Sequence, residues 1–316
     1  KRIIEYNRFL HLMLEIELTY PKPVPNRLLN IWSNPVFMQT VAEISNFIPW
    51  HLVCYKGTTI VAVLPLYEKK ILGCRVLKRS SLSYYQGLNL WLEENSLPAR
   101  KLLDALQITM AIARGLKSNF KRIRINLTPE TYDIRGFLWN KMQAVPFYTF
   151  VHNLNSELKP LPDKRRDLAQ AEKQNYTFEE GLNIEEFIGL LKILKVKKNW
   201  NPDCDYQGLV DFIRILYREG MLRQMNLTQQ GKIVSSNLIL QDGKKVYNIY
   251  QATEDNALKK GACSLHTVKL IELLQTEGFQ ELDFCGSSIP EIARFNSALG
   301  LQLKLFFQIR SSAMVK

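Results

Sequence analysis

The sequence is poor in the residues that build metal centres and disulfide frameworks. Of its 316 residues only five are Cys and four are His, and both kinds are scattered along the chain. No two cysteines form a C-x-x-C pair, and the histidines are too dispersed to make a cluster of ligands. Because structural zinc sites and disulfide scaffolds need such spacing, the sequence predicts reduced, mostly buried thiols and no metal site.

Long apolar runs are also missing. No stretch approaches the roughly 20 consecutive apolar residues that a membrane-spanning helix needs. Glu5, Glu15 and Glu17 interrupt the partly apolar beginning of the chain, and no small-residue cleavage site follows it. We therefore expect a cytoplasmic protein without a transmembrane segment.

Acidic residues are outnumbered by basic ones, which gives a formal net charge of +12. This excess favours an anionic partner: RNA, nucleotide phosphates or an acidic membrane surface. A basic surface that is merely solvated explains the same composition equally well. The length, with 46% hydrophobic residues, is enough for about two domains with a large core.

The first half of the chain alternates helical and extended patterns. Apolar residues in 1–20 indicate an amphipathic helix, which Pro21, Pro23 and Pro25 end. Later segments predict a helix at 34–44, a hairpin at 51–66 and a helix at 98–114. They then predict a strand at 122–127, a helix around Trp139 and a closing strand at 145–151. The polar segment 153–162 contains two prolines. We place a domain boundary there, with domains at 1–155 and 156–316.

The second half begins with helical patterns and then becomes a meander of strands. Helices are expected at 163–175, 184–199 and 206–220, and strands at 221–227, 232–241 and 245–252. In the last of these strands the simple alternation of side chains directs Tyr247 to one face and Tyr250 to the other. A further helix reaches Thr276 and leads to a short final strand.

Residues 281–300 contain the most informative pattern. A short strand ends at Asp283, small residues including Gly286 and Ser287 follow, and Pro290 suits the first turn of a helix that Gly300 ends. A strand that opens into a helix through small residues presents backbone N–H groups. Such groups suit a carboxylate, an amide or a phosphate.

The same stretch, D-F-x-G-S-S-I-P-x-I-A-R-F-x-x-x-L-G from Asp283 to Gly300, resembles the C-terminal signature of the FemAB-like branch of the GNAT acyltransferase superfamily. The resemblance implies an α/β (α+β) protein of two tandem GNAT-like domains, each a mixed sheet flanked by helices. It further implies an N-acyltransferase that moves an acyl or aminoacyl group to an amine acceptor in cell-envelope (peptidoglycan) synthesis.

Three functions stay open at this point. The first is the FemAB-type transfer, in which the acceptor amine attacks the donor ester or thioester directly. The second is CoA-dependent N-acetylation of a small molecule or glycan. The third is a non-catalytic GNAT-like protein that binds RNA or an acidic membrane through Lys and Arg. No tightly bound cofactor is expected, and the donor is either aminoacyl-tRNA or acyl-CoA.

The donor site implied by the resemblance lies between the strand 245–252 and the helix after it. Its expected residues are Lys259, Lys260, Gly261, Ala262 and Ser264. A loop without bulky side chains at a helix N-terminus can turn backbone N–H groups toward a phosphate. Only one glycine of the CoA-binding loop pattern is present, which favours an aminoacyl-tRNA donor over acetyl-CoA.

The chemistry of direct transfer needs few side chains. We expect Tyr250 to stabilise the oxyanion and Asp283 to orient or deprotonate the attacking amine. Asp283 could instead cap the loop at 286–288. Cys285 has no neighbour that would lower its pKa, so the sequence indicates a structural thiol.

Twelve residues are candidates for substrate contacts because they are basic, aromatic, amide-bearing or small at expected loop and helix ends. Some of them have a structural alternative. Tyr84 and Tyr85 could be a packed pair, and Trp200 could cover the core. Lys164, Arg165 and Arg294 could form ordinary surface ion pairs. Asn296 occupies a position where relatives often carry Lys, which weakens the case for a nucleotide-linked peptidoglycan precursor. The candidates are Tyr84, Tyr85, Lys164, Arg165, Lys197, Trp200, Tyr247, Gln251, Gly286, Ser287, Arg294 and Asn296.

Overall fold

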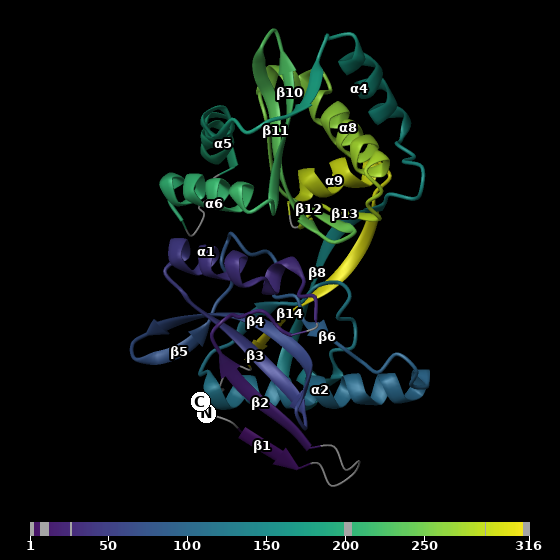
Figure 1. Ribbon diagram of the computed structural model, residues 1–316. Coiled ribbons are helices and arrows are strands. Elements are labelled where there is room, and N and C mark those ends of the chain that lie inside the picture. Colours follow the sequence, from purple (N-terminus) through teal and green to yellow (C-terminus); the bar gives the residue numbers. More distant parts are fainter. Residues whose placement is uncertain (1–2, 7–12, 26, 199–203, 288, 312–316) are drawn as a thin grey trace. The chain divides into compact units, whose positions relative to one another are not determined.

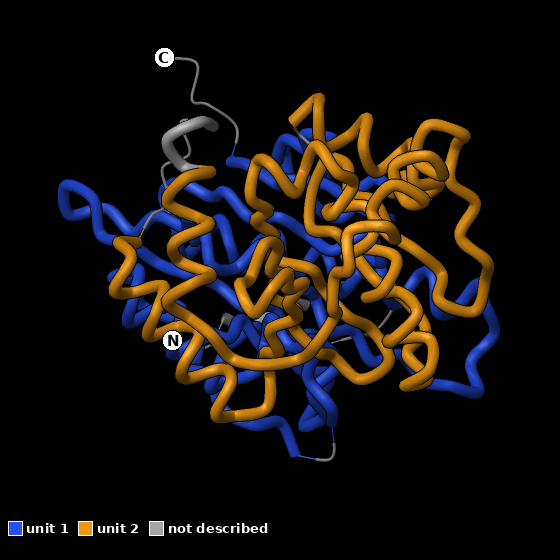
Figure 2. Tube along the Cα trace, turned by 90° about the horizontal axis from the view of Figure 1, so that it is seen from above, with its two compact units in different colours: residues 1–147, 305–316 blue, residues 148–304 orange. Residues whose placement is uncertain are grey.

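The computed structural model describes residues 3–6, 13–25, 27–198, 204–287 and 289–311. The chain divides into two compact units (Figure 2), of which the first comprises residues 1–147 and 305–316 and the second residues 148–304. The chain passes from one unit to the other within two strands, Met142–Asn153 (β8) and Gln302–Ser311 (β14). A division at residue 155, as expected from the prolines, does not include this return of the C-terminal residues to the first unit.

The first unit is built on an antiparallel sheet in the order β1-β2-β3-β4-β5, with β6 paired to β4 (Figure 1). A second pairing, between β7 and the end of β14, also belongs to this unit. The strands are Ile3–Tyr6 (β1), Met13–Thr19 (β2), Ile48–Lys56 (β3), Thr59–Ile71 (β4), Cys74–Leu77 (β5), Asn89–Leu90 (β6) and Arg124–Asn126 (β7). The helices are Ile31–Ser33 (η1, a 3-10 turn), Pro35–Ser45 (α1), Pro98–Asn119 (α2) and Arg135–Trp139 (α3).

The described residues near the beginning of the chain, 3–6 and 13–19, are β-strands, so the helix expected over residues 1–20 is wrong. β1 pairs with β2, and β2 pairs with β3, both antiparallel. Along β2, Leu14 and Ile16 are buried while Glu15 and Glu17 alternate with them. This period of two is the strand pattern, and packing on the sheet favours it over the weaker helical period.

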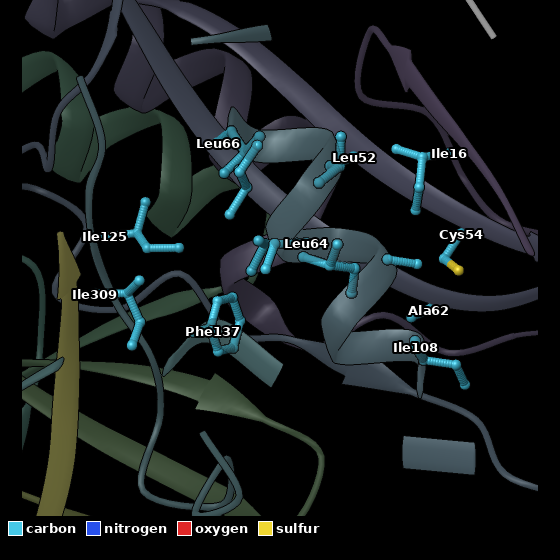
Figure 3. Packing of buried hydrophobic residues seen from close by; sticks show 14 of the residues in the cluster. Ile16, Leu52, Cys54, Ala62, Leu64, Leu66, Ile108, Ile125, Phe137 and Ile309 are labelled. Atoms are coloured by element: carbon cyan, nitrogen blue, oxygen red, sulfur yellow. The ribbon is translucent and has the colours of Figure 1, made fainter. Parts of the chain in front are cut away.

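The core of the first unit lies between its sheet and helix α2 (Figure 3). Ile16, Leu52 and Leu64 from three neighbouring strands pack with Ile108 of α2 in one buried cluster. Ile309 of β14 completes the same cluster from the end of the chain. The unit therefore needs its C-terminal strand for a closed core, because burial of apolar area supplies most of the stability.

The second unit is a sheet in the order β8-β13-β12-β11-β10-β9 (Figure 1), in which the expected three-strand meander is confirmed. Its other strands are Thr177–Glu180 (β9), Leu222–Gln229 (β10), Lys232–Asp242 (β11), Lys245–Thr253 (β12) and Glu281–Asp283 (β13). Its helices are Pro162–Glu172 (α4), Ile184–Lys198 (α5), Tyr206–Arg218 (α6), Asp255–Lys259 (α7), Ala262–Thr276 (α8) and Pro290–Ala298 (α9). The mixed α/β architecture expected from the sequence is confirmed.

Helices lie on both faces of this sheet. In Figure 1, α5 and α6 lie on one side of β10 and β11, and α8 lies on the other with α4 beside it. Leu270 and Leu274 of α8 pack on Ile239 and Val246 of the sheet in a buried cluster. Within the described ranges no helix is long and apolar enough to cross a membrane.

Candidate functional site

The two central parallel strands of the second unit separate after a short contact. β12 pairs with β13 at only three positions, the last being Tyr247 with Asp283. β12 then continues to Thr253, whereas β13 ends and the chain turns away through Cys285, which has a positive φ of 50°. We call the divergence of residues 248–253 from residues 284–287, where the pairing has ended, the splay.

A β-bulge in β12 decides which side chains face the splay. The register with β11 pairs Leu240 with Tyr247 and Leu238 with Tyr250, so one extra residue, Ile249, is inserted between them. The bulge moves the alternation by one position. Tyr247 and Tyr250 therefore lie on the same face, and the expectation of one tyrosine on each face is wrong.

This shared face is the one that α5 approaches. The strand pairing places Asp283 beside Tyr247 there, and Lys245 beside Glu281. Tyr247 is buried and Tyr250 is half-buried. The two predicted catalytic residues, Asp283 and Tyr250, thus come from neighbouring strands and lie on one face of the sheet.

The Asp283 carboxylate is fully buried and engaged with its surroundings. Its Oδ1 accepts hydrogen bonds from Thr149 Oγ1 at 2.6 Å and from the Cys285 backbone N–H at 2.8 Å. Lys245 Nζ lies 4.0 Å from its Oδ2. These are the contacts of a carboxylate that fixes the turn after β13, which is the alternative role that the sequence left open. The catalytic role stays a prediction.

The small residues after β13 use their backbone donors within the protein. The Gly286 N–H donates to Thr149 Oγ1 at 3.1 Å, and the Ser287 hydroxyl donates to the Tyr148 carbonyl. Burial, with the nearby Asp283 carboxylate, raises the pKa of the Cys285 thiol well above its usual range, as befits a structural thiol. The expectation of amide donors facing an open groove is therefore wrong at Gly286, because its N–H, like that of Cys285, holds the turn itself.

The glycine expected in the donor loop is covered. Gly261 is buried with φ of 80°, and a Cβ atom at this position would lie 2.2 Å from the Asp167 carbonyl oxygen of α4. Ala262 and Ser264 are buried as well, whereas Lys259 and Lys260 are exposed. Because helix α4 packs on this loop, the open phosphate cradle expected at 261–264 is not what the structure has.

The first turn of α8 lies beside the far end of β12. Gln251 Nε2 lies 3.5 Å from Cys263 Sγ, and the Thr253 hydroxyl is 2.7 Å from Ser235 Oγ. Lys164 of α4 pairs with Asp167 at 2.7 Å and places its Nζ 4.8 Å from the centre of the Phe295 ring. The fold thus gathers Gln251, Lys164 and the start of α8 in the second unit.

Three buried polar residues on the α8 face escaped the sequence analysis. Asn237 is fully buried, and among the described residues neither of its side-chain polar atoms has a partner. The same holds for Asn248 Oδ1 and His266 Nε2. Asn237 pairs with Gln251 across the strands, and Asn248 Nδ2 donates to Gln251 Oε1 at 3.4 Å. Buried polar atoms are usually satisfied, so these three side chains form a polar strip with unused hydrogen-bonding capacity among the described residues. Amides inside otherwise apolar strands were the available signal.

Replacing His266 by Gln is expected to weaken the pH dependence of folding. Burial lowers the pKa of His266 to about 3, whereas an unfolded chain has the ordinary value of about 6.5. The stability that the neutral ring contributes is fully present above about pH 6.5 and is lost as the pH falls toward 3. Between pH 7 and 5 this residue alone should cost about 2 kcal/mol of unfolding free energy. Urea unfolding of both proteins at the two pH values measures this, and equal pH slopes would contradict it.

Among the described residues, no hydrogen bond or ion pair brings the other predicted contacts to the splay. Arg294 and Arg165 are exposed and Asn296 is buried. In the first unit, Tyr85 is fully buried against Trp32 and Phe306, with Tyr84 against it. Tyr85 is thus part of a core, the structural alternative, and its role in substrate contact gains no support. Trp200 and the side chain of Lys197 lie outside the described residues.

Comparison with known proteins shows which solved structures have a similar fold. No family model and no curated protein matches the sequence. The crystal structure of FemX is similar over 90% of this chain and 92% of its own, with a TM-score of 0.63 and 12% identity. The C-terminal domain of a putative lysylphosphatidylglycerol synthetase from Agrobacterium fabrum gives 0.58 and 12%, over 88% of this chain and 89% of its own. A conserved protein of unknown function from Bacteroides thetaiotaomicron gives 0.60 and 10%, over 90% of each chain. The expected relation in fold to FemAB-like GNAT proteins is confirmed.

Proposed function

We propose that this protein transfers an acyl or aminoacyl group to an amine acceptor at the splay of the second unit. One observation carries the proposal: β12 and β13 separate after Tyr247 and Asp283 while β12 runs on to Thr253. A strand edge that is released from its neighbour offers N–H and C=O groups to an extended ligand. The likeness in fold to FemX and to the lysylphosphatidylglycerol synthetase domain supports this assignment.

The polar strip beside the splay suits a donor that carries amide or hydroxyl groups. Asn237 and Asn248 have side-chain atoms whose hydrogen-bonding capacity the described residues leave unused. Leaving such atoms buried and unsatisfied costs about 1–3 kcal/mol each, which a polar ligand group can offset. Gln251, between the strip and α8, is placed to orient the same ligand.

The reaction needs no covalent enzyme intermediate. The acceptor nitrogen attacks the donor carbonyl carbon, an amide bond forms, and the bond from that carbon to the donor oxygen breaks. The amine loses a proton and the leaving oxygen gains one, so the transfer balances as amine plus ester giving amide plus alcohol. Tyr250, half-buried on the Asp283 face, is the residue we assign to hold the proton at the leaving oxygen. Asp283 keeps the turn after β13 in place.

An aminoacyl ester on RNA is the donor that we favour. The α4 main chain covers Gly261, which counts against binding the pyrophosphate of CoA at that loop. Lys259 and Lys260 nevertheless remain exposed just before α8 and suit phosphates of a larger donor. An amine of a cell-wall precursor is our proposed acceptor.

The experiment supplies both donor classes to one acceptor. Purified protein is incubated with bulk tRNA charged with tritiated amino acids, or with labelled acetyl-CoA, and with a soluble cell-wall precursor whose peptide carries a lysine side chain. Label that survives mild alkali is amide-linked, because aminoacyl esters hydrolyse. We expect such label from charged tRNA. Product from acetyl-CoA alone would overturn the choice of donor.

A matched pair of variants tests the residue assignment. Tyr250→Phe removes one hydroxyl at the splay, and we expect the transfer rate to fall by about 100-fold, the lower end of the effect of a general acid–base group. Tyr217→Phe makes the same change on α6 at a partly exposed side chain and should leave the rate unchanged. Equal rates for the two variants would remove Tyr250 from the reaction.

A further inference from the structure

The net positive charge of the chain comes entirely from the first unit. Of the 42 Lys and Arg residues 20 belong to residues 148–304, and so do 20 of the 30 Asp and Glu residues, so the second unit is neutral. The first unit holds the remaining 22 basic and 10 acidic residues, which is the whole net charge of +12. The unit that contains the splay therefore does not account for the basic composition. The excess of basic residues in the first unit needs an explanation of its own.

Strand pairing brings several of these basic residues together around the β4–β5 hairpin. Lys69 pairs with Val76, and Val76 bridges to Arg122, so Lys69 and Arg122 share one face of the sheet. Lys70 pairs with Arg75 on the other face, beside Lys121, whose N–H donates to the Arg75 carbonyl. We call the surrounding cations the basic collar; they are Lys69, Lys70, Lys78, Lys121, Arg122 and Arg124.

Acidic residues are excluded from the collar. Neither residues 69–79 nor residues 114–129 contain Asp or Glu. The carboxylate of β4 that precedes the collar, Glu68, is buried and already accepts hydrogen bonds from Arg75 at 2.6 Å and from Trp50 at 2.7 Å. Arg75 is thereby committed to the core, whereas the side chains of Lys70, Lys78, Lys121, Arg122 and Arg124 are exposed. The two chain segments that supply the collar therefore carry exposed charge of one sign, which suits a polyanion.

The tip of the same hairpin is apolar. Leu72 is 99% exposed and Ile71 is 43% exposed. Leu72 and Gly73 form the turn with φ of 49° and 75°, a conformation in which Asn-Gly is the favoured pair and Leu is strained. A leucine here is unfavourable both for the turn and for contact with water. Leu72 and Ile71 together make an apolar tip next to the collar, an arrangement that suits contact with another molecule.

We propose that the β4–β5 hairpin docks the first unit on an anionic lipid bilayer (Figure 1). Leu72 and Ile71 enter the interface between headgroups and acyl chains, and the basic collar contacts the anionic headgroups around them. A nucleic acid is the weaker fit, because sequence-tolerant RNA binding uses aromatic side chains to stack bases, and residues 69–79 contain none. This inference does not depend on the proposed transfer reaction.

Vesicle sedimentation tests the apolar tip. The full chain is spun with vesicles of phosphatidylglycerol and phosphatidylcholine, and with vesicles of phosphatidylcholine alone. We expect binding to the first kind only, and a loss of about tenfold or more for Leu72→Asn, since an inserted side chain is removed. The variant suits its turn and should fold. Leu97→Asn is the matched control, because Leu97 is also exposed and precedes α2, where Asn is a good cap.

Charge reversal tests the basic collar. Lys70→Glu with Lys78→Glu should abolish binding to anionic vesicles. Lys56→Glu with Lys101→Glu makes the same change of charge outside the collar and should retain most of the binding; Lys56 ends β3 and pairs with Thr59, at the end of β4 away from the hairpin tip. Equal loss in both pairs would mean that only net charge matters, and would overturn a docking hairpin.

A fluorophore on Cys74 reports on the tip itself. Cys74 is the exposed cysteine among those described, and it follows the turn directly. An environment-sensitive dye there should shift to shorter wavelength when anionic vesicles are added. An unshifted dye on vesicle-bound protein, binding to neutral vesicles, or binding to bulk RNA but not to vesicles would each overturn the proposal.

Discussion

Replacing Asp283 by Ala should destabilise the second unit by about 3 kcal/mol and lower the transfer rate by about 100-fold or more. The carboxylate is buried, and its loss leaves the Thr149 hydroxyl and the Cys285 N–H without their acceptor. Removing one member of a buried charged network is among the larger effects of a single substitution. Urea unfolding measures the stability loss without reference to any reaction, and the tRNA-dependent transfer assay measures the rate.

Thr149→Val separates the two roles proposed for Asp283. This change removes the hydroxyl that links Asp283 to the Gly286 N–H but keeps the carboxylate. If Asp283 acts by fixing the turn, Asp283→Asn and Thr149→Val should slow transfer by similar factors, with the pH profile of the rate unchanged. A much larger effect of Asp283→Asn, together with loss of the acidic limb of that profile, would show that the carboxylate takes the proton of the amine.

Gly261→Ala should destabilise the second unit by about 3 kcal/mol, far more than the same change at the other end of the same helix. At Gly261 the new methyl group would meet the Asp167 carbonyl at 2.2 Å, in a backbone conformation that disfavours side chains. Overpacking and left-handed strain each cost roughly 1–3 kcal/mol. α4 would have to move to relieve the contact.

Gly278→Ala is the matched control for this effect. Gly278 follows α8 with φ of 77°, nearly the same as Gly261, but nothing lies within 4 Å of a Cβ there. Only the left-handed strain remains, so a loss of about 1 kcal/mol is expected. Urea unfolding of the two variants gives the comparison. Equal losses would mean that α4 does not press on the start of α8, and the argument against a CoA pyrophosphate at this loop would fall.

The prediction from sequence succeeded where local patterns and packing agree. The meander of β10, β11 and β12 was readable because turns at Gln230-Gly231 and Asp242-Gly243 separate alternating strands. It failed where two periods compete: residues 13–19 fit a helix loosely and a strand well, and pairing with β3 selects the strand. The prediction of which side chains share a face also failed, because Ile249 is the extra residue of a β-bulge and the composition of a strand does not reveal a bulge.

The candidate site was predicted in part. Asp283, Tyr250 and Gln251 do lie around the splay, since the order of strand and helix along the chain fixes them there. Asn237 and Asn248 were missed, because a polar residue in a strand shows neither its burial nor its lack of a partner until its neighbours are placed. Gly261 was expected in an open loop, because the local sequence does not show that α4 packs on this residue.

The sequence by itself determined the mixed architecture, the strand order of the meander and the basic composition, since these follow from periodicity and charge that each segment carries alone. Only the tertiary structure decided that Gly261 is sealed, that two tyrosines share a face, that the whole net charge resides in one unit, and that six of the cations of this unit belong to segments around an apolar tip. Such properties arise from contacts between segments far apart in the chain. In a close-packed interior, a single methyl group can decide whether two segments fit against each other. The local sequence pattern of one segment does not contain this information.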